Sequence, residues 1–191
     1  MSQIADQSAR GRKNVAFSEA ATWRGFGPGW KQVHGSFDES GISFEWHDFK
    51  TGKLLDWATT FHPNSLELCL NLEGDGVVRS SSAEAKFIAM TGGFYRSGKT
   101  ALKAHREPGR HRFFTVEFSF DFLRKHLSGA KDLHPAVQAA INGTEGGTVS
   151  EVQPLSAEIQ RLVETLRHPP ILTSAQKVWY RSKALELAVA F

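Results

Sequence analysis

The feature that most restricts the fold of this chain is a change in its hydrophobic period near Ser119. Before this point apolar and polar residues alternate, most clearly in LELCLNL (66–72), where four leucines occupy every second position. A period of two is typical of a β-strand with one buried face. After Ser119 apolar residues recur every three to four positions, as in an amphipathic helix. The sequence therefore predicts strands first and helices second.

Short strand-like segments follow one another between about Gly41 and Phe120. The segment ISFEWHDF (42–49) alternates in the same way, and LELCLNL leads into the turn 73–76, where glycine supplies positive φ. Further strands are predicted at Gly76–Arg79, Lys86–Met90, Gly93–Arg96, Thr100–Arg106 and His111–Ser119. Many short strands at this spacing indicate a barrel or a double-sheet sandwich.

The helical part begins where the strands end. Ser119 is placed to cap a helix that carries Phe122 and Leu127, and Pro135 stands in the first turn of another. A third helix is predicted from the apolar spacing after Leu155. Beyond the Pro169–Pro170 break, Thr173 or Ser174 is placed to cap a last helix, with Val178, Leu185 and Val189 as its apolar stripe. The predicted class is α+β, mainly β, with segregated elements.

Composition narrows the classes of function. The net charge is only +3, and the basic residues are scattered, whereas a nucleic-acid-binding face would cluster them. The single Cys69 excludes an internal disulfide and fits the reducing cytoplasm. No apolar stretch approaches the roughly 20 residues that span a bilayer, and the N-terminus lacks the apolar core of a signal peptide. A cytoplasmic protein without a membrane partner is predicted.

Three stretches resemble the N-terminal domain of AraC-type transcriptional regulators, especially the branch of the pyochelin-sensing regulators. They are LELCLNLEGDG (66–76), RHRFFTVEFSFDFLRKHL (110–127) with HPAVQAAI (134–141), and the helical end 155–191. The resemblance implies a cupin-like double-stranded β-helix that binds a small effector, followed by a helical hairpin that dimerises. In that family a pair of helix-turn-helix motifs then binds DNA. No such motif follows Phe191 here, so DNA binding is expected only through a domain outside this chain.

Three regions are accordingly expected: a flexible N-terminal segment at 1–30, the cupin-like barrel at 31–120 and the helical dimerisation region at 121–191. Glycine and proline forbid regular structure in Trp23–Trp30, yet two tryptophans and a phenylalanine lie there. This segment is expected either to cover the barrel mouth as a lid or to pack on the outside of a sheet.

Aromatic residues on or near the predicted strands suggest a small-molecule pocket. An apolar cavity with a few convergent polar groups is the usual form of such sites, and Arg106 is suited to binding a carboxylate or phosphate. For each aromatic taken singly, core packing remains the alternative. The candidate ligand-binding residues are Trp46, Trp57, Phe61, His62, Tyr95, Arg106 and Phe113.

A metal site is the competing hypothesis. His62, Glu67 and Gly74 match the first cupin motif, but Thr60 replaces its first histidine, and the segment around His111 is one residue too short for the second motif. His62, Glu67 and His111 are the candidate two-His, one-carboxylate set. Leucines lining the barrel interior would turn Glu67 away from it. No metal or other cofactor is therefore expected, and a metal-dependent cupin dioxygenase or isomerase remains the alternative.

The helices are the expected partner surface, because a C2 dimer is the commonest homo-oligomer. The candidate interface residues are Leu155, Ile159, Leu162, Leu166, Trp179 and Leu185. Alternatively, both stripes pack on the barrel. The sequence thus predicts a non-catalytic effector-sensing and dimerisation domain, with an oligomerisation module around a filled barrel as a third class.

Overall fold

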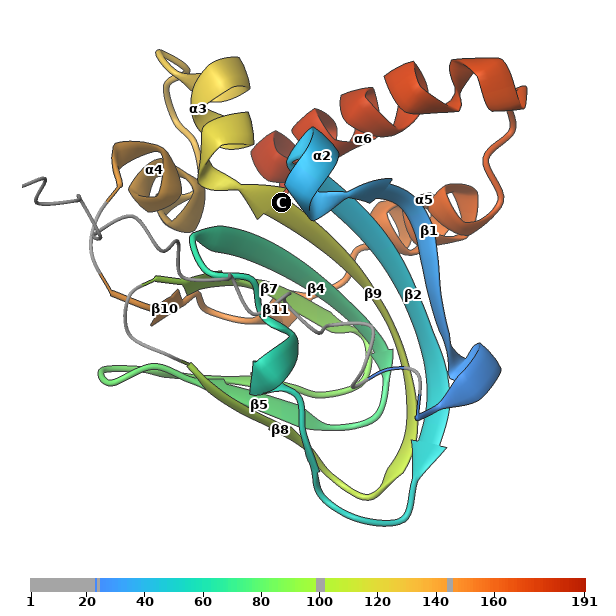
Figure 1. The fold of residues 1–191 in the computed structure, drawn as a ribbon. Helices are drawn as coiled ribbons and strands as arrows, with labels where there is room; N and C mark the ends of the chain where they lie inside the picture. Colours follow the sequence, from blue (N-terminus) through green and yellow to red (C-terminus); the bar gives the residue numbers. More distant parts are fainter. Residues whose placement is uncertain (1–22, 24, 99–101, 144–145) are drawn as a thin grey trace, which may run out of the picture.

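The computed structural model describes residues 23, 25–98, 102–143 and 146–191, which form two facing antiparallel sheets with helices on one side (Figure 1). The seven-stranded sheet has the order β1-β2-β9-β4-β7-β10, and β11 also pairs with β7. Its strands are β1 (Trp30–Ser36), β2 (Ile42–Thr51), β9 (Gly109–Ser119), β4 (Ser65–Glu73), β7 (Thr91–Ser97), β10 (Thr148–Val149) and β11 (Gln153–Pro154).

The four-stranded sheet closes the other side of the barrel, in the order β3-β8-β5-β6. Its strands are β3 (Leu55–Asp56), β8 (Lys103–Arg106), β5 (Gly76–Arg79) and β6 (Glu84–Phe87). The predicted α+β, mainly β arrangement with a cupin-like barrel and C-terminal helices is confirmed. The strand predictions are confirmed to within a few residues, and β5 has the predicted bounds. The start of the predicted strand Thr100–Arg106 lies outside the described residues.

Strands also form where the sequence analysis expected none. Strand β1 precedes the first predicted strand, and β10 and β11 come from the region assigned to the helices. Both of these two-residue strands extend the large sheet by pairing with β7. The barrel therefore takes in residues on both sides of the expected boundary at 120.

Four helices cover the outer face of the large sheet (Figure 1). They are α3 (Phe120–Leu127), α4 (Pro135–Asn142), α5 (Ala157–Arg167) and α6 (Gln176–Ala190). The described residues also form the short helix α2 (Phe37–Ser40) and the 3-10 turns η1 (Gly27–Gly29), η2 (Ala58–Thr60) and η3 (Thr173–Ala175). Ser119 caps α3 as predicted, its hydroxyl accepting from the Phe122 N–H at 3.1 Å. The predicted cap of the last helix is wrong, because Thr173 and Ser174 belong to η3 and the N-cap is Ala175.

Helix α6 buries a different face from the one expected. Tyr180, Ala184 and Leu187 are buried, whereas the side chains of Val178 and Val189 are 74% and 53% exposed. The Tyr180 hydroxyl donates to the Leu166 carbonyl of α5 at 2.7 Å, and an alanine side chain lets the helix approach the sheet. Tertiary packing has therefore overruled apolar spacing, which alone does not say which stripe is buried. Among the described residues, none of the helices is long and apolar enough to cross a bilayer.

Two separate hydrophobic cores result, one on each face of the large sheet. The first lies between this sheet and the helices and includes Leu66, Leu68, Leu70 and Phe118. The second lies inside the barrel, between the two sheets, and is largely aromatic; it includes Trp23, Trp57, Phe61, Tyr95 and Phe113. The barrel interior is thus a distinct compartment from the helix-facing core.

Candidate functional site

The leucine face of β4 points towards the helices, which corrects the assumption that it lines the barrel. Leu66, Leu68 and Leu70 belong to the helix-facing core, and Cys69 belongs to the interior. Because successive side chains alternate across a strand, Glu67 also faces inward, where it accepts a hydrogen bond from the Tyr95 hydroxyl. The apolar faces of the helices pack on a continuous apolar surface, and the leucines of β4 form part of that surface. The objection that Glu67 faces away from the interior is therefore wrong.

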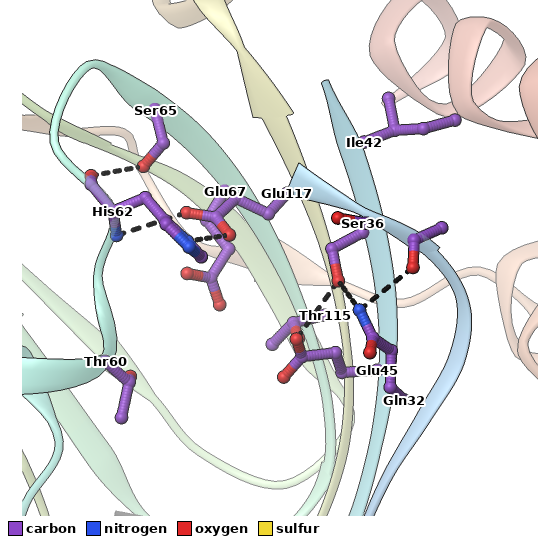
Figure 2. Close-up of polar contacts among 12 residues, drawn as sticks. Gln32, Ser36, Ile42, Glu45, Thr60, His62, Ser65, Glu67, Thr115 and Glu117 are labelled. Atoms are coloured by element: carbon purple, nitrogen blue, oxygen red, sulfur yellow. Dashed lines mark hydrogen bonds and ion pairs between the residues drawn. The ribbon is translucent and has the colours of Figure 1, made fainter. Parts of the chain in front are cut away.

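Three glutamates lie buried inside the barrel on adjacent strands. Glu45 is on β2, Glu117 on β9 and Glu67 on β4, and Glu67 is the register partner of Glu117. Figure 2 shows Glu67 and Glu117 beside His62, with Glu45 next to Thr115. Each strand contributes one carboxyl at an inward position, so the cluster is a direct product of strand register.

Each carboxyl accepts hydrogen bonds from its surroundings. Glu117 lies 2.7 Å from His62 Nδ1 and also accepts from the His62 backbone N–H at 3.3 Å. Glu45 accepts from the Trp30 indole N–H at 2.9 Å and from the Ser43 hydroxyl at 3.1 Å. Each of these carboxyls thus has hydrogen-bond donors within the protein itself.

Burial sets the protonation of this cluster. Desolvation, reinforced by the charge of Glu117, raises the pKa of Glu67 well above its ordinary value. Desolvation likewise raises the pKa of Glu117, opposed by its hydrogen bond to His62. His47 is also buried, and desolvation lowers its pKa. Burial therefore favours the neutral forms of Glu67, Glu117 and His47 over their charged forms.

Arg106 is the guanidinium of the interior and is fully buried. Its Nη1 donates to Asn71 Oδ1 at 3.0 Å, and its Nη2 lies 3.6 Å from the Cys69 sulfur. Its Cζ lies 3.5 Å from the ring centroid of Phe113 and 4.4 Å from that of Trp57. The positive charge is thus held against aromatic faces, which attract it through their quadrupoles.

The structure brings together six of the seven predicted ligand-binding residues. Five of them lie in the barrel interior: Trp57, Phe61, Tyr95, Arg106 and Phe113. The sixth, His62, is joined to this interior by its hydrogen bond with Glu117. Trp46 is not with them. It belongs to the helix-facing core, where the Arg167 Cζ lies 3.9 Å from its ring centroid, because its strand position is out of phase with the inward residues Glu45 and His47.

The candidate metal set does not fit a metal ion. His62 is bonded to Glu117, Glu67 to Tyr95, and His111 Nε2 lies 2.8 Å from the Glu107 carbonyl oxygen. Within the described parts of the chain, no group of three or more His, Cys, Asp or Glu side chains is arranged to hold a metal.

Trp23 contributes an indole to the interior from the N-terminal segment. It is 1% exposed, and its ring lies 4.6 Å from His47 and 5.6 Å from Phe49 between centroids. The expected lid segment thus places one ring inside the barrel, while Gly27–Gly29 forms η1 close to Phe49. Residues 1–22 and 24 of the expected flexible segment lie outside the described residues.

A covalent path leads from the interior to the helices. Strand β9 carries Phe113 and Glu117 on its inward face and continues through Ser119 directly into α3. His62, bonded to Glu117, also stacks on Phe37 of α2 with ring centroids 4.1 Å apart. Phe37 lines two pockets of about 540 and 520 Å³ that lie outside the barrel, next to α3, and the second also reaches α6.

Sequence reasoning missed Glu45, His47 and Glu117 as interior residues, although a signal was present. ISFEWH, LELCLNL and FTVEFS each alternate apolar and polar residues and carry one glutamate in the polar phase. Strand pairing brings these three phases to the same face. Because that face is the barrel interior, the polar phase marks the candidate site.

The predicted six dimer residues are divided between the core and the surface. Leu155 and Leu166 are buried in the helix-facing core. The other four are partly buried against that core; they are Ile159, Leu162, Trp179 and Leu185. The buried pair therefore packs the helices on the sheet, and the other four residues keep part of their surface exposed.

The sequence model of the family described as "Regulatory protein PchR N-terminal domain" matches residues 33–191. A search of curated protein sequences found no match.

Solved structures that are similar to this chain match it with low identity and low TM-scores. ToxT from Vibrio cholerae is 8% identical over 78% of this chain and 56% of that chain, with a TM-score of 0.45. A putative ethanolamine utilization protein from Salmonella typhimurium is 17% identical over 47% and 67%, with a TM-score of 0.36. A cupin domain of an XRE family transcriptional regulator from Enterobacter cloacae is 11% identical over 47% and 93%, with a TM-score of 0.35.

Proposed function

The chain belongs to the family of regulatory protein PchR N-terminal domains, the N-terminal part of AraC-type regulators, and on this basis we propose that it is an effector-sensing domain. It binds a small molecule inside the barrel without converting it, and it pairs with a second copy through its helices. A DNA-binding part of a longer cytoplasmic protein then responds to the bound state.

The observation that carries the proposal is the continuity of β9 with α3. The strand presents interior side chains, and two residues after Glu117 its last residue, Ser119, caps the helix. A ligand that moves Glu117 or its partner His62 must therefore act on α3 through the chain and on α2 through Phe37. Such a movement couples the barrel interior to the helices only if the ligand binds one arrangement of the helices better than another.

The outer face of α6 supports dimerisation. Val178, Leu185 and Val189 are spaced seven and four residues apart, so they fall on one stripe of the helix. Val178 and Val189 are mostly exposed, and Leu185 is only partly buried. We propose this stripe, rather than the buried Leu155 and Leu166, as the centre of a C2 interface.

Glutamates at Val178 and Val189 are expected to weaken self-association at least tenfold while leaving the melting temperature within a few degrees. The substitutions place charges in an apolar interface but occupy exposed positions in the single chain. Sedimentation equilibrium measures the dimer constant. Ile88→Glu is the matched control, because Ile88 is similarly exposed but lies outside the helices. Equal dimerisation by all three proteins would contradict the proposed interface.

Native mass spectrometry of the chain, purified from cells that contain its natural effector, tests the sensing proposal. The expected result is a dimer carrying one additional small mass per chain, which is released when the protein unfolds. Hydrogen exchange before and after its removal should then differ in α3 and α6. Two results would contradict the proposal. One is a monomer without any bound molecule at all concentrations, and the other is hydrogen exchange in the helices that does not change when the retained molecule is removed.

A further inference from the structure

Arg106 is a buried cation whose charge interacts with the Glu67 carboxyl but which makes no direct contact with a carboxylate among the described residues. Its polar contacts are the neutral Asn71 and the Cys69 thiol, and within the described residues it forms no ion pair with a carboxylate. Its Nε–H has no hydrogen-bond partner. Burial lowers the pKa of Arg106, because desolvation penalises the charged form. Buried charges are normally paired, so this arrangement needs an explanation.

A second donor beside Arg106 also lacks an acceptor. The Trp57 indole N–H is buried and has no hydrogen-bond partner, while the Arg106 guanidinium lies 4.4 Å from the Trp57 ring. Unsatisfied buried donors are rare in folded proteins. Here two of them, one permanently charged, occupy neighbouring positions in the same compartment.

The carboxyl cluster shows the opposite pattern. Glu45, Glu67 and Glu117 each accept a hydrogen bond from a protein donor. The donors left without an acceptor therefore lie at Arg106 and Trp57, whereas each of the three glutamates already has a donor within the protein.

We propose that the effector carries an anionic group, a carboxylate or a similar oxyanion, which accepts hydrogen bonds from Arg106 Nε and Trp57 Nε1 inside the barrel. This inference rests on the proposed sensing function and specifies its ligand class. The anion supplies a directly bound counter-ion, and hydrogen bonds to a charged group are stronger than neutral ones.

The apolar part of this effector takes the place of the Trp23 indole. Trp23 packs on His47 and, at 6.3 Å between ring centroids, on Phe113, whose ring Arg106 also contacts. Trp23 lies outside the strands of both sheets, so its withdrawal breaks no ladder hydrogen bond. His47, which packs beside Trp23, has a buried Nδ1 atom that also lacks a hydrogen-bond partner. An effector ring in the position of the Trp23 indole is separated from Arg106 only by the Phe113 ring.

Calorimetric titration with three matched naphthalene probes tests the proposal. The probes are 2-naphthoate, its neutral amide 2-naphthamide, and the cation 2-naphthylmethylammonium. We expect 2-naphthoate to bind the Trp23→Ala variant more tightly than the wild type, and to bind both at least tenfold more tightly than the other two probes. Arg106→Met should weaken 2-naphthoate binding roughly 10- to 100-fold, as loss of a charged hydrogen-bond partner does.

Two further variants keep the test independent of misfolding. Trp57→Phe retains a ring and removes only the indole N–H, and it should cost about 3- to 10-fold in 2-naphthoate affinity. Lys103→Met removes an exposed positive charge from the same strand as Arg106 and should change nothing. Circular dichroism confirms that each variant is folded.

Three results would overturn the proposal. They are equal or tighter binding of the amide or the cation, 2-naphthoate binding that survives both Arg106→Met and Trp57→Phe, and no binding of 2-naphthoate even to Trp23→Ala. Binding of the cation or the amide in the barrel would leave the sensing function intact with a different ligand class. The retained mass in native mass spectrometry judges that function separately.

Discussion

Tyr180→Ala is expected to lower the free energy of unfolding by about 3–5 kcal/mol, the usual cost of removing a large buried ring. Tyr180 is 1% exposed and stacks on His34 with ring centroids 4.2 Å apart. Its hydroxyl donates to the Leu166 carbonyl, so one side chain joins α6 to α5 and to the sheet. Denaturant unfolding measures the loss, and hydrogen exchange should show α6 opening before the barrel.

Two neighbouring substitutions separate the contributions of Tyr180. Tyr180→Phe keeps the ring and should cost only about 1 kcal/mol for the lost hydrogen bond. Trp179→Ala removes a larger side chain that is only partly buried, and it should cost less than Tyr180→Ala. If the two alanine variants were equally destabilised, Tyr180 would not be the main anchor of α6.

Glu67→Gln is expected to raise the free energy of unfolding at neutral pH by roughly 1–3 kcal/mol, since it replaces a buried ionisable group by a neutral one. The glutamine oxygen still accepts the hydrogen bond that Tyr95 now donates to Glu67. Desolvation raises the pKa of Glu67 in the folded protein, so ionisation at higher pH destabilises that state. Chemical denaturation of the wild type and the variant between pH 4 and pH 9 measures the effect.

The sign of the pH dependence follows from proton binding. Between the ordinary glutamate pKa of 4.5 and the raised pKa of Glu67, the folded state holds a proton that the unfolded state has released. The stabilisation from Glu67 is therefore complete below pH 4.5 and is lost as the pH rises through the folded value. The advantage of Glu67→Gln should be near zero at pH 4 and grow as the pH rises. The lowered pKa of His47 gives a pH dependence of stability with the opposite sign, but this contribution is the same in the wild type and in Glu67→Gln.

Glu84→Gln is the matched control for this experiment. Its hydrogen bond from Arg79 lowers the pKa of Glu84, so the exposed carboxylate favours the folded state when ionised. Replacing it should slightly destabilise the protein above pH 4.5, which is the opposite sign. A Glu67→Gln curve parallel to that of the wild type at all pH values would show that Glu67 ionises normally in the barrel.

Much of the fold could be predicted from local patterns. The alternation in LELCLNL predicted β4, and the Ser119 cap predicted the start of α3, because both depend on neighbouring residues. The two-residue strands β10 and β11 could not be predicted, since they exist only by pairing with β7. The predicted cap of α6 was wrong for a related reason, because local propensity did not distinguish the 3-10 turn η3 from the first turn of an α-helix.

The candidate site divides in the same way. The alternation in the sequence is enough to give β4 one leucine face and one face with Glu67, Cys69 and Asn71, because side chains alternate along any strand. Which of these faces lies inside the barrel depends on the packing of the helices and the second sheet. The helices are amphipathic and must bury their stripes, so they cover the leucines and leave the polar face to the interior. Alternation sets which residues share a face, and the partner that packs on each face sets its environment.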